Sequence, residues 1–236
     1  MKKSLKLSIY LFFATFSIVA FILFFNAVDN SLTEEDIIYL KKIVDLPKVN
    51  SDTLSYEEQI ELISHIQNAV LEVAPINKGI ELNRKREPKD LLQAGHGLCF
   101  DRSRVIEKIL KYYGFKTRHI FMYARQGASC FLQPLLQPGI PSHALTEVLT
   151  KNGWLIVDSN HKWLSITKDN KPISVNQFSK AFLNGRSINW KTVLPNEVYR
   201  EPFYYIYGLY SRHGKFYPPF NAIPDINYSE LIQNFY

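Results

Sequence analysis

Residues 93–99 read QAGHGLC, and the organisation of the chain can be worked out from this stretch. Its two glycines allow a tight bend directly before Cys99. Small and apolar residues then recur at helical spacing up to residue 113, and Gly114 supplies a helix stop. The pattern predicts a helix over 99–113 with the cysteine at its N-terminus. There, unpaired backbone amides and the helix dipole favour the thiolate form of Cys99.

Two β-strands expected further along the chain carry an imidazole and a carboxylate. Residues 117–123 are rich in strand formers, and a proline-rich loop separates them from a second strand over 143–149. A turn then leads to a third short strand over 154–157, which ends in Asp158. The order predicts a helix packed against an antiparallel sheet, with His143 and Asp158 on neighbouring strands.

The length of the turn decides whether His143 can reach Asp158. A loop of residues 152–153 alone leaves Asp158 four residues from the position opposite His143, which is too far for a hydrogen bond. A loop that includes residues 150–153 makes Asp158 a diagonal neighbour of His143, about 7 Å away between backbones. Asn160 then lies opposite His143 and is an alternative acceptor for the imidazole. A carboxylate also stabilises the imidazolium that forms during catalysis, which favours Asp158.

These side chains together predict nucleophilic catalysis. A single cysteine is more often a small buried hydrophobe than a catalytic group. A thiol nucleophile needs a neighbouring base, and the base needs an acceptor on its other ring nitrogen. We therefore predict a catalytic triad of Cys99, His143 and Asp158.

The ordered motifs between Gln93 and Asp158 resemble the transglutaminase-like superfamily, the rearranged relatives of papain-type cysteine proteases. GLC at 97–99 looks like the nucleophile turn of that family, and SHALTEV at 142–148 is similar to its His-Ala strand. In the family's third strand an aromatic residue precedes the triad aspartate by four, as in WLIVD at 154–158. The resemblance implies an α+β fold with a transglutaminase-like or papain-like core, in which the nucleophile helix packs on an antiparallel sheet.

One departure from the family pattern bears on the substrate, and one further residue bears on the oxyanion hole. Leu145 stands where the family often has an aromatic residue two positions after the histidine, which puts the substrate preference in doubt. Gln93 lies six residues before Cys99, the spacing at which papain-type enzymes hold an oxyanion-hole glutamine. An ordinary loop glutamine is an equally good interpretation of Gln93.

Three other residues are candidates for substrate binding. His96 lies beside the nucleophile turn, while Tyr210 and His213 belong to a loop over 208–219 that mixes aromatics, cations and glycines. Such a loop can form a wall for a sugar or a peptide, but packing within the fold is the main alternative for its aromatic residues. No histidine has metal-ligand spacing with the cysteines, so we expect neither a metal nor another cofactor.

The first thirty residues predict a membrane anchor. Three of the first six residues are lysines, and residues 7–25 then run without a charged side chain, which is long enough for a transmembrane helix. A cleaved signal peptide is the alternative, although its apolar region is usually only about 7 to 15 residues long. We expect residues 1–30 to be a cytoplasmic stub and a signal anchor. The rest of the chain would then be extracytoplasmic, in the periplasm or on the cell surface.

The remaining residues, 31–236, predict a single domain with its catalytic core at about 90–165 and an aromatic-rich C-terminal extension over 166–236. The whole chain has 28 Lys and Arg against 22 Asp and Glu, and the charges are interspersed. This gives no reason to expect a nucleic-acid partner. The two cysteines, Cys99 and Cys130, permit a disulfide but cannot build a disulfide scaffold.

Two classes of function are consistent with these features. The first is thiol-dependent acyl transfer or amide hydrolysis on an extracytoplasmic peptide, protein or cell-envelope glycoconjugate. A triad is the same for attack by water and attack by an amine, so both outcomes stay open. The second is a non-catalytic module that binds an envelope protein or polysaccharide on the same fold. The complete triad favours the enzyme.

Overall fold

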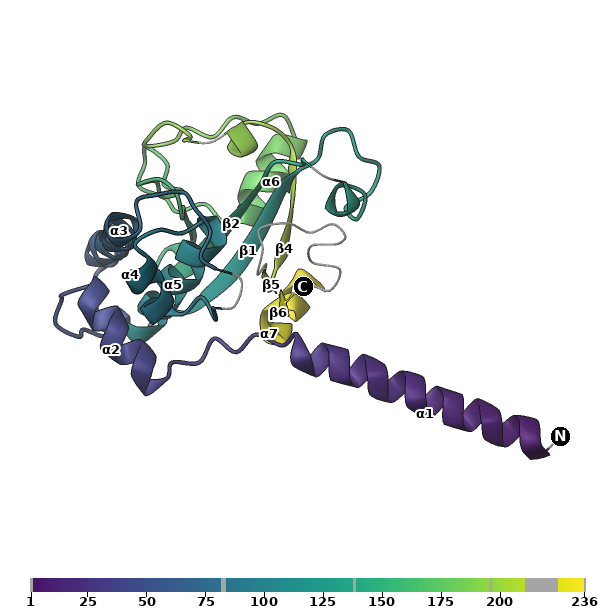
Figure 1. Cartoon of the computed structure of the whole chain (residues 1–236). Helices are drawn as coiled ribbons and strands as arrows, with labels where there is room; N and C mark the ends of the chain where they lie inside the picture. The colour runs from purple at the N-terminus through teal and green to yellow at the C-terminus, as the bar shows by residue number, and fades with distance from the viewer. Residues whose placement is uncertain (1, 82–83, 138, 196, 211–224, 236) are drawn as a thin grey trace.

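The computed structural model describes residues 2–81, 84–137, 139–195, 197–210 and 225–235. Four helices lie before the first strand of the domain: α2 (Glu34–Ile43), α3 (Tyr56–Val73), α4 (Pro88–Ala94) and α5 (Cys99–Tyr112). Together with α6 (Val175–Leu183), which follows the strands β1 to β3 in the sequence, they enclose a central sheet (Figure 1). Near the C-terminus lies the short helix α7 (Tyr228–Leu231). Helix α5 begins at Cys99, which confirms the helix predicted there.

Local sequence signals define where the helices begin. Thr33 and Ser55 precede α2 and α3, and each side chain accepts a hydrogen bond from the backbone three residues on, while the acidic residue there bonds back. These capping boxes satisfy amides that the helix leaves unpaired. Helix α4 was not predicted from the sequence. It starts with Pro88, whose fixed backbone angle suits the first helical turn.

The central sheet is antiparallel, with the strand order β3-β2-β1-β4. The sequence predicted three of its strands, which are β1 (Thr117–Ala124), β2 (Ser142–Thr150) and β3 (Gly153–Val157). The fourth strand, β4 (Phe203–Tyr207), comes from the aromatic-rich extension and pairs with β1. The other elements are short: β5 (Leu209–Tyr210), β6 (Asp225–Ile226), η1 (Ser51–Thr53), η2 (Pro134–Leu136), η3 (Glu197–Tyr199) and η4 (Ile232–Phe235).

The strand register between β2 and β3 is the one expected for a loop over 150–153, although the loop itself is shorter than that. Leu149 pairs with Trp154 and Thr150 with Gly153, so the turn itself consists of two residues. Gly153 has a φ of 125°, which side-chain-bearing residues rarely adopt. Extended past the end of β3, this register puts Asp158 diagonally opposite His143, as predicted.

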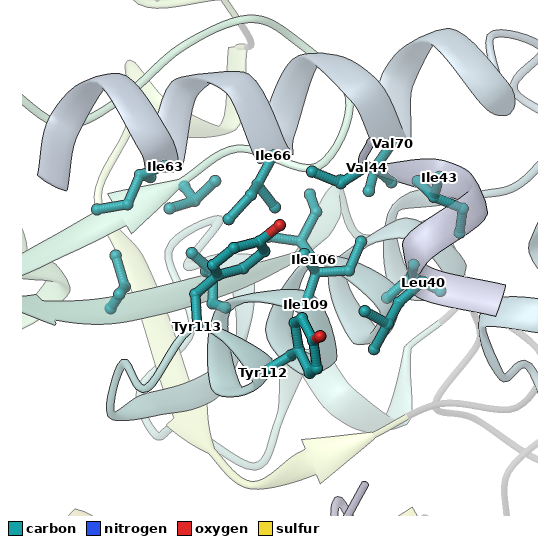
Figure 2. Close-up of a cluster of buried hydrophobic side chains, with 14 of the residues drawn as sticks. Leu40, Ile43, Val44, Ile63, Ile66, Val70, Ile106, Ile109, Tyr112 and Tyr113 are labelled. Atoms are coloured by element: carbon teal, nitrogen blue, oxygen red, sulfur yellow. The ribbon is translucent and has the colours of Figure 1, made fainter. Parts of the chain in front are cut away.

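The described residues form three hydrophobic clusters, and the two larger ones lie on the two faces of the sheet. In the first, α2 and α3 pack on α5 and on the sheet, and Figure 2 shows Ile63, Ile66, Ile106 and Ile109 interdigitating there. The second core covers the other face with α6 and with aromatic residues of the extension, including Phe178 and Tyr199. Among the residues of the extension that the structure describes, the aromatic side chains are thus mainly part of the core.

Helix α5 lies within the first core, between the sheet and the helices α2 and α3, and most of its charged side chains are buried and paired. Lys108 donates to Asp36 at 2.9 Å and lies 2.5 Å from Glu87. Asp101 forms a buried ion pair with Arg86. Removing one partner of such a pair leaves an uncompensated charge and typically costs about 3–5 kcal/mol of stability. These pairs tie α2 and the segment before α4 to the central helix.

The predicted anchor lies in α1 (Lys2–Phe25), which leads away from the domain in Figure 1. A helix that crosses a bilayer needs about 20 predominantly apolar residues. Within the described residues, no helix combines that length with enough apolar character to span a membrane. The predicted N-terminal transmembrane helix was therefore wrong, and so was the membrane-anchored, extracytoplasmic location derived from it.

A cluster of buried polar side chains connects the C-terminal region to α5. The Tyr210 hydroxyl donates to Glu107 at 2.8 Å, and Asn30 contacts the same carboxylate at 3.1 Å. The backbone N–H of His119 donates to Glu230 at 2.8 Å. The cluster thus holds two carboxyl groups, Glu107 and Glu230, which share the Tyr210 hydroxyl.

The two carboxyl groups cannot both ionise at low cost. Burial and the charge of Glu107 raise the pKa of Glu230 to about 9. Burial also acts against ionisation of Glu107, but Lys111, 2.7 Å away, lowers its pKa overall. Glu230 therefore carries the proton at neutral pH and Glu107 carries the charge.

We predict that Glu230→Gln removes a pH dependence from the folding stability. In the unfolded chain a glutamate ionises near pH 4.3, whereas the folded state keeps the Glu230 proton up to about pH 9. Folding then takes up a proton, so stability falls as pH rises through this window, by up to about 1.4 kcal/mol per unit. Glutamine mimics the neutral acid and should make the variant more stable than the natural protein at pH 8, but not at pH 5.

Urea unfolding at pH 5 and pH 8 measures the difference. Glu201→Gln, at an exposed glutamate, is the matched control and should follow the natural protein at both pH values. A Glu230→Gln variant that shows the same change of stability between the two pH values as the natural protein would contradict the assignment of the proton.

Candidate active site

The turn before α5 fixes the position of Cys99. The carboxylate of Asp101 accepts the backbone N–H of Leu98 at 2.9 Å and that of Ile80 at 3.3 Å. A Cβ atom at Gly97 would lie 2.7 Å from a methyl carbon of Leu91, so a larger residue at this position would have to displace the Leu91 side chain. Cys99 follows as the first residue of α5, half-buried and not in a disulfide.

His143 and Asp158 form a buried hydrogen-bonded pair beside the N-terminus of α5. His143 Nε2 lies 3.0 Å from Asp158 Oδ2, and both side chains are excluded from solvent. The other oxygen, Oδ1, accepts the backbone N–H groups of Asn160 at 2.6 Å and of His161 at 2.8 Å. Because Nε2 is engaged by the carboxylate, Nδ1 is the imidazole nitrogen left for Cys99.

The surroundings of Cys99 favour its thiolate. Burial opposes the charge, but the hydrogen bond and positive charge of His143 more than compensate and lower the pKa of the Cys99 thiol. Backbone N–H groups of Ala144 and Phe100 lower this pKa further. The structure thus brings the predicted nucleophile and base into direct interaction.

The aspartate supports the cationic form of the imidazole. Burial alone lowers the pKa of His143, yet the charge and hydrogen bond of Asp158, together with Cys99, raise it to about 10. Burial also acts on Asp158, but His143 and the other hydrogen-bond donors hold the pKa of its carboxyl far below the usual range. A thiolate, an imidazolium and a carboxylate are therefore the expected charge states at neutral pH.

Asn160 has a different partner from the one considered in the sequence analysis. Its side-chain oxygen accepts a hydrogen bond of 2.6 Å from Arg102, and the same guanidinium donates to the carbonyl groups of Ala74 and Ile76. Asp158 rather than Asn160 bonds to the imidazole of His143. Asn160 thus fixes the loop after β3 to α5.

Gln93 and His96 lie together, but apart from the three residues above. Both line a pocket of about 210 Å³, whose other lining residues are Ile80, Glu81, Arg84, Asp90 and Ala94. Cys99, His143 and Asp158 do not line this pocket. An oxyanion-hole role for Gln93 and a substrate contact for His96 therefore stay predictions.

Of the two C-terminal candidates, the structure describes Tyr210, which lies away from Cys99, His143 and Asp158. Tyr210 is buried in the cluster of Glu107 and Glu230 and stacks on His119, with ring centroids 4.0 Å apart. His213 lies outside the described residues, as does most of the proposed loop wall over 208–219. The described part of that loop, residues 208–210, packs within the fold.

Sequence reasoning missed Tyr199, which the structure places against Asp158. The Tyr199 hydroxyl forms a short hydrogen bond to Asp158 Oδ2, the oxygen that also bonds to His143. Tyr199 belongs to η3 in the extension, where no periodic pattern or motif marks it. A buried tyrosine hydroxyl needs a partner, but the sequence does not show which one.

The fold and the site define a class: an α+β protein with a cysteine at a helix N-terminus and a histidine–aspartate pair on the adjoining strands. Comparison with protein families makes the class more specific. Residues 48–159 match the family described as the transglutaminase-like superfamily. The resemblance drawn from the nucleophile turn and the two strands is confirmed, and it supports a thiol enzyme.

Comparisons with whole proteins and with solved structures find only low sequence identity and partial structural overlap. Of the curated proteins compared with the chain, none matches. A crystal structure of Rad4–Rad23 bound to a 6-4 photoproduct UV lesion matches with 14% identity and a TM-score of 0.36, over 61% of this chain and 38% of that one. Arylamine N-acetyltransferase from Salmonella typhimurium matches with 19% identity and a TM-score of 0.32, over 55% and 45%. The chain thus spans less than half of either protein.

We predict that iodoacetamide alkylates Cys99 at least about tenfold faster than Cys130 at pH 6, although Cys130 is the more exposed. An ordinary thiol is under about 1% ionised at that pH, whereas the hydrogen bond and charge of His143 lower the pKa of Cys99 and so raise its thiolate fraction. Mass spectrometry of peptides from the reduced, folded protein measures the two rates.

His143→Ala provides the control, because it removes the cation that stabilises the thiolate. The rate advantage of Cys99 should then be lost at pH 6, while labelling of Cys130 should stay as it is. Equal and slow labelling of both cysteines in the natural protein would show that Cys99 is not activated.

Proposed function

We propose that this protein is a cysteine-dependent acyltransferase or amidase, with Cys99 as nucleophile, His143 as general acid and base, and Asp158 as the residue that orients His143. The observation that carries the proposal is the continuous interaction from Cys99 through His143 to Asp158 at the N-terminus of α5. The match of residues 48–159 to the transglutaminase-like superfamily supports it.

The proposed reaction has two steps. The Cys99 thiolate attacks the carbonyl carbon of an amide or ester, and the bond to the leaving group breaks as His143 gives that group its proton. A thioester on Cys99 and a neutral imidazole remain. Water or an amine then attacks the thioester and passes its proton to His143, which restores the thiolate and the imidazolium.

The helix terminus supplies charge stabilisation in both steps. The backbone N–H of Cys99 belongs to the first turn of α5, where amides have no partner within the helix. It is therefore available to the oxyanion that forms on the substrate carbonyl. Asp158 accepts two backbone N–H groups through Oδ1, which leaves Oδ2 aimed at His143 throughout the reaction.

The acyl donor is proposed to be a peptide, a protein or a glycoconjugate with an amide or ester bond. Water as acceptor makes the protein a hydrolase, and an amine makes it a cross-linking or amine-transferring enzyme. A non-catalytic binding module would need neither a stabilised thiolate nor an oriented base, so the complete site favours the enzyme over that alternative.

An activated ester tests the chemistry without knowledge of the natural substrate. We predict that a p-nitrophenyl ester releases one equivalent of p-nitrophenol in a rapid first phase and leaves its acyl group on Cys99. Peptide mass spectrometry locates the acyl group. Adding a primary amine separates the two outcomes, because an acyltransferase converts the thioester to an amide product faster than water removes it.

Asp158→Asn should slow the acylation step by about 10² to 10⁴-fold, because an amide neither stabilises the imidazolium nor favours the correct tautomer. Asn160→Ala is the matched control. It removes a hydrogen bond to Arg102 but leaves the His143–Asp158 pair in place, so acylation should stay within a few-fold of the natural rate.

The opposite pattern, with an inactive Asn160→Ala variant and a nearly normal Asp158→Asn variant, would contradict the role of Asp158. Absence of any acyl group on Cys99, in a protein whose Cys99 still reacts with iodoacetamide, would contradict the proposed acyl transfer.

A further inference from the structure

Two donors share a single oxygen of Asp158. His143 Nε2 lies 3.0 Å from Oδ2, and the hydroxyl of Tyr199 forms a short hydrogen bond to the same atom. An ionised carboxylate can only accept, so the tyrosine hydroxyl must donate. Burial and the adjacent carboxylate raise the pKa of Tyr199 well above its usual value, which keeps the proton on the hydroxyl.

The ring of Tyr199 is held in place on several sides. It packs against Trp163 with ring centroids 5.0 Å apart, against Phe178 at 6.2 Å, and edge-on against His143 at 6.0 Å. Tyr199 is excluded from solvent. With its ring fixed, the hydroxyl has a fixed direction, so its bond to Asp158 is a permanent part of the site.

The remaining hydrogen bonds of Asp158 are independent of Tyr199. Oδ1 accepts the backbone N–H groups of Asn160 and His161, and the His161 ring lies 3.4 Å from the same oxygen. These bonds hold the carboxylate in its orientation even without the tyrosine. The hydroxyl therefore has an effect of its own on Oδ2, which is to withdraw negative charge from the atom that binds the imidazole.

We propose that Tyr199 is a positioning residue of the Cys99–His143–Asp158 site, which weakens the hydrogen bond between Asp158 and His143 and thereby limits how strongly the imidazolium is held. This inference rests on the proposed function. It assigns a part in the chemistry to the C-terminal extension, because Tyr199 lies outside the residues 48–159 that match the family.

The strength of the hydrogen bond between Asp158 and His143 matters because His143 must release its proton to the leaving group. An imidazolium that is held too firmly by the carboxylate is a poor acid. The charged and titratable groups that face Asp158 are His143 on β2, Tyr199 on η3, His161 after β3, and Arg102 with Cys99 on α5. Of these, His143 and Tyr199 bond to Oδ2.

Tyr199→Phe removes only the hydroxyl and keeps the packed ring. In a Cys130→Ser background, iodoacetate reacts with Cys99 alone and gives a bell-shaped pH profile, since the anionic reagent needs both the thiolate and the imidazolium. The alkaline limb of this profile reports loss of the His143 proton. We expect that limb to move to higher pH in Tyr199→Phe, by about one unit.

A second readout works at neutral pH. The proton on His143 Nε2 gives a downfield NMR signal, assigned by its absence in His143→Ala, and this signal should move further downfield in Tyr199→Phe because the bond to Asp158 becomes stronger. Tyr113→Phe is the matched control. Tyr113 is equally buried and donates to the carbonyl of Leu46 at 3.2 Å, away from the site, so neither readout should change.

Replacing Tyr199 with 3-fluorotyrosine keeps the hydroxyl and makes it a stronger donor. Both readouts should then move in the opposite direction, which provides a test even where Tyr199→Phe does not fold. An alkaline limb and an NMR signal that stay at their natural values in both variants would overturn the inference and leave Tyr199 a structural role alone.

Failure of the proposed function has a different signature. The acid limb of the profile of the natural protein reports formation of the Cys99 thiolate. An acid limb at the pH of an ordinary thiol, near 8.5, would show that Cys99 is not activated, whatever the effect of Tyr199. An acid limb well below that value, combined with unchanged readouts in the Tyr199 variants, would overturn the inference alone.

Discussion

Helix α5 is covered on every side, and most other features of the structure follow from the need to satisfy its buried charges. Asp101 forms an ion pair with Arg86, and Lys108 forms ion pairs with Asp36 and Glu87. Glu107 accepts a hydrogen bond from Tyr210. A buried charge without a partner costs several kcal/mol, so these pairs allow few alternative positions for the surrounding segments. The N-terminal region and the C-terminal helix are thereby fastened to the same element.

This arrangement has a direct consequence for the site. The N-terminus of α5 is held against β2, so Cys99 lies beside His143 and beside a backbone N–H of the same strand. Asp158 accepts from two backbone amides, His143 and Tyr199, and none of its acceptor positions is left to solvent. Rigid support of this kind is what general acid–base catalysis requires, because proton transfer depends on fixed distances.

The C-terminal extension belongs to the same fold and is not an appendage to it. Its strand β4 pairs with β1 and adds a fourth strand to the sheet, and its aromatic residues contribute to the core on the second face. Tyr199 reaches Asp158 from this core, and Glu230 reaches α5 from the last helix. Although the family match ends at residue 159, the residues beyond it complete both buried polar clusters.

The sequence by itself determined the helix that begins at Cys99 and three strands, because capping residues, glycines and alternating strand patterns act over short distances. It left two loop lengths open between β2 and β3, and the register of the structure is the one that brings His143 and Asp158 within reach of each other. The uncharged run over residues 7–25 also suggested a transmembrane helix. Among the described residues, however, no helix is both long and apolar enough to span a membrane. Only the tertiary structure decided that Asn160 bonds to Arg102, that Tyr210 is buried with Glu107, and that Tyr199 shares Asp158 with the histidine. These contacts join residues 41 to 103 positions apart in the chain, and they depend on which faces pack together, which no local pattern records.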